Sequence, residues 1–248
     1  MTYNLIGDIH GRNSWRQLVR TDMINIFLGD YLDPYDRDDL QAASAEYDNL
    51  QDIIRFKQQH PETILLLGNH DLHYLWDEHY SRYNAEHAER YAQLIREHLH
   101  LFQAAYAIGD RVLVTHAGVT RPWLQLAGIS EQQSASQLAE AICRCMSDEE
   151  SRHLFSVEST FHPDDSCGIS PTASPIWVRP HTLLDYGALT NHHGDTIYQV
   201  VGHTQIGQIM QFDSCVFVDC LGTLPQSLRI TFDAAGEPIF TPLPAKIQ

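Results

Sequence analysis

The sequence contains near its start the stretch Tyr3-Asn4-Leu5-Ile6-Gly7-Asp8, a short apolar run that ends in a glycine and then a carboxylate. Two later apolar runs also end in a glycine and then a polar residue, with Ile24 to Leu28 before Gly29-Asp30 and Thr63 to Leu67 before Gly68-Asn69. Helical patterns separate the three runs, at Ser14 to Arg20 and at Gln41 to Gln59. Because strands that alternate with helices build layered sheets, this pattern predicts an α/β fold.

These strand ends predict a binding crevice. In open α/β sheets, ligands collect beyond the carboxyl ends of the strands, so Asp8, Asp30 and Asn69 should share one crevice. Two further predicted strands also end in polar residues: Arg111 to Thr115 precedes His116, and Thr196 to Val201 precedes Gly202-His203. The candidate site therefore draws on strand ends that are spread over most of the chain.

The remaining segments predict helices, an insertion and further strands. Asp71 to Phe102 has the spacing of one or two amphipathic helices. The chain is helical again from Ser134 to Cys145 and then polar and irregular, which favours a cap-like insertion near residues 130–175 within a single domain over residues 1–248. Three closely spaced apolar runs predict an antiparallel meander, and they are Ile209 to Phe212, Cys215 to Asp219 and Ser227 to Phe232.

The charge balance argues against a nucleic acid polymer as partner. The chain of 248 residues has 32 acidic and 16 basic side chains, a formal net charge of −16. Such a chain repels a polyanion at long range and offers few Lys and Arg side chains for phosphate contacts. Bound divalent ions can still create a local positive site, so phosphorylated small molecules and phosphorylated protein side chains stay open as partners.

The location that the sequence predicts is the cytoplasm. No stretch approaches the roughly 18 apolar residues that a membrane span needs, and the N-terminus lacks the basic and apolar regions of an export signal. The five cysteines are an odd number without a regular spacing, which is typical of reduced thiols. We therefore expect no membrane partner.

The polar residues at the strand ends are of the types that bind metals. They combine carboxylate, amide and imidazole groups without thiolate, a mixture that suits manganese, iron or zinc. There are enough of them for two ions. Two ions that share a bridging carboxylate can activate a water molecule and hold phosphoryl oxygens, so a phosphate ester is the substrate that suits such a site best.

Five segments resemble the signature blocks of the calcineurin-like metallophosphoesterases. They occur in that family's order and extend from residue 7 to residue 204. The segments are Gly7-Asp8-Ile9-His10-Gly11, Gly29-Asp30-Tyr31-Leu32-Asp33, Gly68-Asn69-His70-Asp71, His116-Ala117-Gly118 and Gly202-His203-Thr204. The resemblance implies a four-layer α/β/β/α sandwich, in which two mixed sheets lie between helices and the metals lie at strand ends.

The resemblance also implies a metal ligand at six positions. Asp8 and His10 would bind the first of two divalent ions, and Asp30 would bridge both ions. The ligands of the second ion would be Asn69, His116 and His203. Manganese is the ion that we expect first, with iron and zinc as alternatives.

Two further residues of these blocks would carry out proton transfer. His70 would protonate the leaving oxygen, and Asp33 would hold and tune His70. This pairing makes physical sense, because a carboxylate stabilises the imidazolium that a general acid requires.

One position suggests a branch of the family. Many nuclease and phosphodiesterase branches have a second histidine two residues after the one that matches His203, where this chain has Gln205. The chain therefore looks more like the phosphoprotein-phosphatase branch, which also contains bacterial diadenosine tetraphosphatases. That branch usually places a phosphate-binding arginine directly after the residue that matches Asp33, where this chain has Pro34. Arg179 and Arg37 are our candidates to replace it.

Three functions stay open at this point. The first is a metal-dependent phosphatase that acts on phosphomonoesters, above all on phosphoserine or phosphothreonine peptides, as a serine/threonine protein phosphatase does. The second is a bis(5'-nucleosyl)-tetraphosphatase, which would need an aromatic slot for adenine. The third is an inactive metal-binding scaffold, which the presence of all ligands and of His70 disfavours. The aromatic side chains that could form such a slot are Trp123, Phe155, Phe161 and Trp177.

Overall fold

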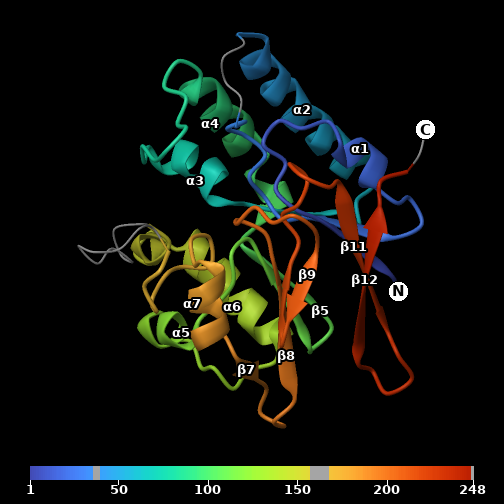
Figure 1. The fold of residues 1–248 in the computed structure, drawn as a ribbon. Coiled ribbons are helices and arrows are strands. Elements are labelled where there is room, and N and C mark those ends of the chain that lie inside the picture. Colours follow the sequence, from blue (N-terminus) through green and yellow to red (C-terminus); the bar gives the residue numbers. More distant parts are fainter. Residues whose placement is uncertain (36–39, 157–167, 247–248) are drawn as a thin grey trace.

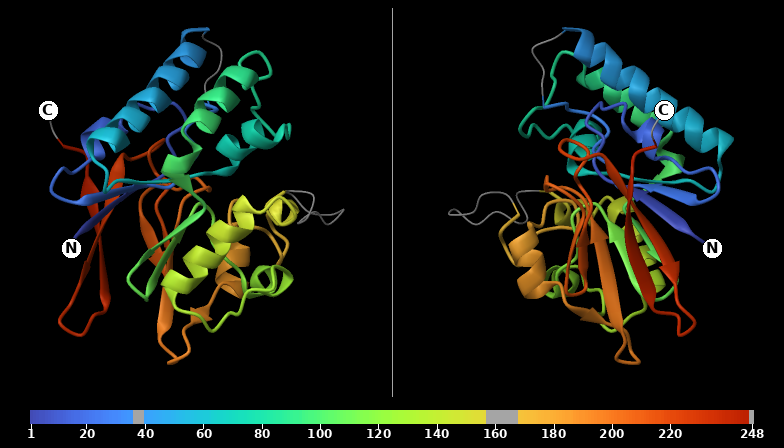
Figure 2. Two further views of the ribbon diagram at one scale, coloured as in Figure 1. Left: turned by 180° about the vertical axis from the view of Figure 1, so that it is seen from behind. Right: turned by 45° about the vertical axis from the view of Figure 1, so that its right-hand side comes forward.

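The computed structural model describes residues 1–35, 40–156 and 168–246, which form two mixed β-sheets packed face to face between two layers of helices (Figures 1 and 2). This arrangement is the predicted four-layer α/β/β/α sandwich. The first sheet has the order β12-β11-β1-β2-β3-β4, and the second has the order β5-β6-β8-β10-β9, with β7 paired to β8.

Parallel pairing aligns the strand ends that the site needs. In the first sheet, β1 (Tyr3–Ile6), β2 (Ile24–Phe27), β3 (Ile64–Leu66) and β4 (Phe102–Gln103) run parallel. In the second, β8 (Thr196–Val201) pairs in parallel with β6 (Val112–Thr115) and β10 (Cys215–Phe217). The remaining strands, all in antiparallel pairs, are β5 (Ala105–Ile108), β7 (Leu189–Thr190), β9 (Met210–Phe212), β11 (Gln226–Phe232) and β12 (Pro238–Pro244).

Helices cover the outer face of each sheet (Figure 2). The first sheet is covered by α1 (Trp15–Leu18), α2 (Leu40–Gln59), α3 (Asn69–Trp76), α4 (Ala88–Glu97) and the 3-10 turn η1 (Leu99–Leu101). The second is covered by α5 (Arg121–Leu126), α6 (Ala135–Ser147), η2 (Arg152–Leu154) and α7 (Pro180–Tyr186). Within the described ranges no helix combines the length and the apolar character that a bilayer crossing requires.

Alternation along the strands divides the core into layers. Leu5 lies in the cluster between the two sheets, together with Val114 and Val200. Its neighbour Ile6 points the other way and belongs to the cluster under the helices, with Trp15. Because successive side chains of a strand point to opposite faces, one short apolar run supplies both layers. Each such side chain, when fully buried, stabilises the fold by about 1.5–3 kcal/mol.

The predicted antiparallel meander is wrong in its last strand. β9 and β10 pair as expected, but β11 leaves their sheet and pairs with β1 in the other one. The opposite edge of β1 is occupied by β2, so without β11 its outer N–H and C=O groups would have no partner. Strand β12, which the sequence did not predict, then covers the outer edge of β11.

The region near residues 130–175 begins with a helix that belongs to the sandwich. Helix α6 packs against β5 and β6. Its start is marked by a capping box, in which the Ser134 hydroxyl accepts from the Gln137 backbone N–H and the Gln137 side chain accepts from the Ser134 backbone N–H. Residues 157–167 lie outside the described residues. That this region acts as a cap, and that the chain forms a single domain, stay predictions.

Candidate metal centre and active site

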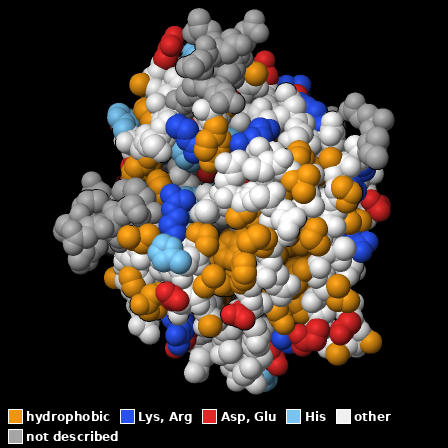
Figure 3. All heavy atoms as spheres, viewed as in Figure 1, with side chains coloured by type: hydrophobic (Ala, Val, Ile, Leu, Met, Phe, Trp, Pro, Cys, Tyr) orange, Lys and Arg blue, Asp and Glu red, His pale blue; other side chains and the backbone are white. Residues whose placement is uncertain are grey.

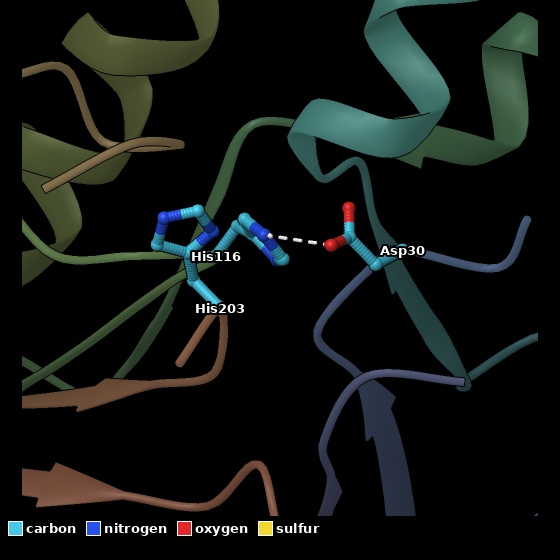
Figure 4. Close-up of side chains that lie close together, drawn as sticks. All are labelled: Asp30, His116 and His203. Carbon is cyan, nitrogen blue, oxygen red and sulfur yellow. Dashed lines mark ion pairs between the residues drawn. The ribbon is translucent and has the colours of Figure 1, made fainter. Parts of the chain in front are cut away.

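The structure brings the five predicted strand ends together at the place where the two sheets meet. Asp8 follows β1, Asp30 follows β2 and Asn69 begins α3 just after β3, all from the first sheet. His116 follows β6 and His203 follows β8, both from the second sheet. Figure 4 shows His116 pointing towards Asp30 along the dashed ion pair, with the ring of His203 beside that of His116. The side chains therefore lie in the single pocket that the sequence predicts.

Asp30 lies at the centre of the cluster. Its Oδ2 is 3.5 Å from Nε2 of His10 and 3.4 Å from Nε2 of His116. Asp8, His10 and Asp30 form one group of possible ligands, and Asp30, His116 and His203 form a second. Because Asp30 belongs to both groups, it is placed where a bridging carboxylate has to be.

Asn69 joins the two histidines of the second group. Its Oδ1 lies 3.1 Å from Nε2 of His116 and 3.0 Å from Nδ1 of His203. Asp8 in turn accepts the backbone N–H of His203 at 3.0 Å and 3.1 Å through its two oxygens. All five side chains at the strand ends are at least nine-tenths buried.

Backbone carbonyls orient two of the imidazoles. Nδ1 of His10 lies 2.8 Å from the carbonyl oxygen of Leu32, and Nδ1 of His116 lies 2.8 Å from that of Leu28. A carbonyl only accepts, so Nδ1 donates in both rings. Each Nε2 then faces the centre of the pocket, as is usual for a histidine that binds a metal.

Backbone strain is concentrated at the site. Of the seven described non-glycine residues with positive φ, four are site residues from the sequence analysis and a fifth, Arg82, contacts one of them. Such conformations cost about 1–3 kcal/mol each and cluster where a function requires them. The four site residues are His10 (φ 44°), Asp30 (φ 49°), Asp33 (φ 61°) and His203 (φ 65°).

The pKa values of the carboxylates show that the pocket concentrates negative charge. Burial raises the pKa of Asp8 well above its usual value, and the neighbouring carboxylate of Asp219 raises it further. Burial also raises the pKa of Asp219, to about 6, against the opposing effect of Arg12. Burial favours a raised pKa for Asp30 as well, but His116 and His70 hold it well below the usual value.

The histidines respond to this charge in two ways. Burial lowers the pKa of His10 to about 3 and also lowers that of His203, so both rings are neutral, as metal ligands must be. For His116, burial has the same tendency, but the carboxylates of Asp30 and Asp8 raise the pKa to about 10. The carboxylates of Asp30 and Asp8 thus favour positive charge at the position of His116.

The donor set fits a pair of divalent ions. Within the described part of the chain, Nε2 of His203 and Oδ2 of Asp219 are buried and have no hydrogen-bond partner. Two glycines let the carboxylates approach the backbone closely, since a Cβ at Gly68 would lie 2.1 Å from Oδ1 of Asp30 and a Cβ at Gly202 would lie 2.2 Å from Oδ1 of Asp8. That the six predicted residues are metal ligands stays a prediction, which these observations favour.

His70 and Asp33 form a buried pair beside the cluster. Nδ1 of His70 lies 2.7 Å from Oδ2 of Asp33, and the His70 backbone N–H donates to Oδ1 of Asp30 at 2.9 Å. Burial alone would raise the pKa of Asp33, but hydrogen bonds from His70 and His73 lower it. Asp33 is therefore an anion that can orient His70.

His73 is a residue whose role the sequence analysis missed. It is completely buried, and its Nε2 lies 2.8 Å from the same Asp33 oxygen that contacts His70. The signal was present, because His70 and His73 are three residues apart and so share a face of α3. Tyr74 and Glu46 hold Asp33 as well, through its other oxygen and its backbone N–H respectively.

Asp71 organises the loops that carry the ligands. Its carboxylate accepts the backbone N–H groups of Asp30 at 2.8 Å, Tyr31 at 2.9 Å and Gly68 at 2.9 Å. It ties the end of β2 to the start of α3. Sequence reasoning quoted Asp71 within a signature block but gave it no role.

The two arginines proposed for phosphate differ in what the structure says of them. Arg37 lies outside the described residues. Arg179 donates to Oγ1 of Thr204 at 3.2 Å, and its charge, after burial, lowers the pKa of His203. Arg179 is therefore next to the second group of ligands, and its role in phosphate binding stays a prediction.

Two of the four aromatic side chains suggested for an adenine slot are completely buried in the core. Trp123 and Phe155 are completely buried and belong to the main core cluster, and Trp177 is 5% exposed. Phe161 lies outside the described residues. Trp123 and Phe155 cannot stack on a base, because core packing covers both.

Comparisons with known proteins agree with this arrangement. A family model described as calcineurin-like phosphoesterase matches residues 1–207. No curated protein gives a significant match. A serine/threonine phosphatase from Saccharomyces cerevisiae, with similarity to human phosphatase PP5, aligns with all of this chain and 81% of its own at 16% identity and a TM-score of 0.55, which shows the fold. A Staphylococcus aureus protein assigned as a 5'-nucleotidase aligns with all of this chain and 54% of its own at 13% identity, with a TM-score of only 0.43.

Proposed function

This chain belongs to the calcineurin-like phosphoesterases and hydrolyses phosphate ester bonds, and we propose that its substrates are phosphomonoesters, with phosphoserine and phosphothreonine peptides first among them. The observation that supports this proposal most is the position of the His70–Asp33 pair beside the two groups of ligands that share Asp30. We also propose manganese as the ion at both positions. A cytoplasmic location stays a prediction of the sequence.

The residues of the pocket would have different roles in the reaction. Two divalent ions there would supply a Lewis acid for the phosphoryl oxygens and an activated water as nucleophile. The six predicted ligands would hold that centre, and Oδ1 of Asn69 lies 3.1 Å from His116 and 3.0 Å from His203, which helps to position both rings. Burial of the pocket excludes other water and strengthens each charge interaction.

His70 would act on the leaving group. Asp33 holds Nδ1 of His70, so Nε2 is the atom from which a proton can pass to the leaving oxygen. Asp33 keeps its negative charge through the hydrogen bonds of His70 and His73, and this charge stabilises the imidazolium. A general acid of this kind accelerates a reaction by about a hundredfold to ten-thousandfold, mostly for poor leaving groups.

The experiment that tests this function compares substrates under manganese. Wild type is assayed against a chromogenic phosphomonoester, phosphopeptides, nucleotides and diadenosine tetraphosphate, before and after chelation. We expect turnover of monoesters that is lost with chelation and restored by manganese. Preferred cleavage of diadenosine tetraphosphate would favour the dinucleoside polyphosphate alternative, and no turnover of any ester would favour an inactive scaffold.

The variant His70→Asn tests the general acid. It should keep both metals and lose at least about a hundredfold in kcat for alkyl phosphates, because their leaving oxygens need the proton. Aryl phosphates with acidic leaving groups should lose much less. Equal losses for both substrate classes would contradict the role of His70.

A further inference from the structure

Arg82 reaches the site from the turn between α3 and α4. Its Nη2 lies 2.8 Å from Nε2 of His70, and its Nη1 donates to the carbonyl oxygen of Asp33 at 3.1 Å. The guanidinium therefore contacts both members of the proton-transfer pair. Nothing in the local sequence Asp77 to Asn84 marks this arginine, and the sequence analysis gave it no role.

The surroundings hold the guanidinium in this place. The carbon at its centre lies 3.9 Å from the centre of the Tyr35 ring, and that ring packs edge-on against His10 at 4.9 Å. Arg82 itself has a φ of 67°, a backbone conformation that residues other than glycine rarely adopt. A strained backbone that directs a side chain onto a site is typical of a functional residue.

The charge of Arg82 is available to an anion. Among the described residues no carboxylate forms an ion pair with it, in contrast to Arg16 and Arg111, which pair with Asp52 and Glu237. Its partners are instead a ring nitrogen, a carbonyl oxygen and the face of a tyrosine. In a chain of net charge −16, Figure 3 shows several Lys and Arg side chains in the upper part of one face and others spread over the rest of it.

Arg12 is the other arginine near Tyr35, and it is less suited. Its guanidinium is 5.3 Å from the centre of the ring, it donates to the backbone carbonyl of Asp8, and its charge lowers the pKa of Asp219. Arg12 is thus engaged with the Asp8 backbone and with the charge of Asp219. Arg82 is the one that lies against the general acid.

We propose that Arg82 binds the phosphoryl group of the substrate and leaves Nε2 of His70 when it does so. The proposal rests on the proposed function. Nε2 of His70 is the atom that would face the leaving oxygen, and in the structure the guanidinium of Arg82 is in contact with it. An arriving phosphoryl group offers the guanidinium two acceptor oxygens, which bind it better than one ring nitrogen. Substrate binding then exposes Nε2 of His70 to the leaving oxygen. Arg82 supplies the phosphate contact for which this chain has no arginine at position 34.

The test measures the binding of inorganic phosphate to the manganese-loaded protein by calorimetry, so it does not depend on turnover. We compare wild type with Arg82→Ala and Arg82→Lys. The control is Arg90→Ala, because Arg90 makes a similar contact with a tyrosine, 3.6 Å from the Tyr47 ring, between helices α4 and α2. Manganese content is determined for every variant.

We expect Arg82→Ala to weaken phosphate binding about tenfold to a hundredfold with full manganese content, since charged hydrogen bonds are lost. Arg82→Lys should recover part of the affinity, because lysine keeps the charge without the planar fork. Added guanidinium should also restore part of the affinity of Arg82→Ala. Arg90→Ala should bind phosphate as wild type does.

Several outcomes would overturn the inference, and they differ from a failure of the proposed function. Unchanged phosphate binding in Arg82→Ala would remove Arg82 from the phosphate site. Loss of manganese in both Arg82→Ala and Arg82→Lys would show a structural role instead. A wild type that binds phosphate but cleaves no ester would contradict the proposed function alone, while absence of phosphate binding in wild type would contradict both.

Discussion

A single absent methyl group decides whether two strands can approach at the site. Gly202 has no positive φ, so the backbone conformation does not require a glycine. The requirement is steric, because a Cβ at this position would lie 2.2 Å from the Asp8 carboxylate. Asp8 uses both oxygens to hold the backbone N–H of His203. Gly202, which precedes His203, therefore leaves the space that the Asp8 side chain at the end of another strand occupies.

The variant Gly202→Ala tests this close approach. The new methyl group should displace Asp8 and reduce manganese affinity at least about tenfold, the size of effect that disturbed outer contacts have at metal sites. Gly207→Ala is the matched control, because a Cβ at Gly207 meets no atom within 4 Å. Calorimetric titration with manganese measures both. Equal affinities of the two variants would contradict the explanation.

The shared position of Asp30 leads to a second prediction for a single residue. Manganese at about a hundred times its dissociation constant should raise the free energy of unfolding of wild type by about 2.7 kcal/mol. Asp30→Asn should lose most of this gain, since a neutral amide cannot bridge two cations. The metal-free variant should unfold at a somewhat lower temperature than metal-free wild type, because His116 and His70 favour the Asp30 anion that the substitution removes, so the comparison uses the increase that manganese gives each protein.

Thermal unfolding with and without manganese measures this effect. Asp52→Asn is the control, since Asp52 is a surface aspartate that pairs with Arg16 and Arg55. It should keep the full increase in Tm. An equally large increase for Asp30→Asn would exclude Asp30 as a bridging ligand.

At the scale of secondary structure, the first turn of α3 organises the site. It contributes Asn69 to the ligands, His70 to proton transfer and Asp71 to the support of two loops. Asp71 accepts three buried backbone N–H groups, from the end of β2 and the start of α3. The helix start is thus attached to the neighbouring strand by one carboxylate.

Removal of that carboxylate should destabilise the whole molecule. Asp71→Ala leaves three buried donors without a partner, each at a cost of about 1–3 kcal/mol, so we expect a loss of at least about 3 kcal/mol in the free energy of unfolding. Asp71→Asn keeps one acceptor oxygen and should lose less. Urea unfolding measures the free energy of unfolding of both variants. A decrease below about 1 kcal/mol for Asp71→Ala would show that water replaces the carboxylate.

At the scale of the whole molecule, the site exists because two sheets meet. The C-terminal part beyond residue 207, which the family model does not cover, connects them: β10 lies in the second sheet and β11 in the first. Leu228 and Ile230 of β11 are completely buried in the cluster between the sheets. Strand β12 is peripheral, with no buried residue.

Two shortened chains separate the contributions of these strands. A chain that ends at Thr223 lacks β11 and β12, and it should lose at least about 3 kcal/mol, since two large side chains are worth about 1.5–3 kcal/mol each. A chain that ends at Gly236 lacks only β12 and should lose less and still bind manganese. Urea unfolding and manganese titration measure both chains. Similar stability of the two would contradict a special role for β11.

The sequence by itself determined which polar side chains meet at the strand ends and the parallel core of the fold. Four of the five strands that end at the site are followed by a glycine and then a polar residue, and β6 is followed directly by His116. Parallel pairing brings such ends to one edge of each sheet. The α/β class and helices α2 and α6 could be predicted closely, because they also depend on local patterns along the chain.

Only the tertiary structure decided where β11 pairs, that Trp123 and Phe155 are covered, and that Arg82 and His73 contact the His70–Asp33 pair. These features depend on which surfaces meet after folding, and His73 and Arg82 lie 40 and 49 positions from Asp33 in the chain, too far to leave a mark on its local pattern. A strand edge, a buried ring or a guanidinium acquires its role from its neighbours in space. Those neighbours are determined by the packing of the two sheets as a whole.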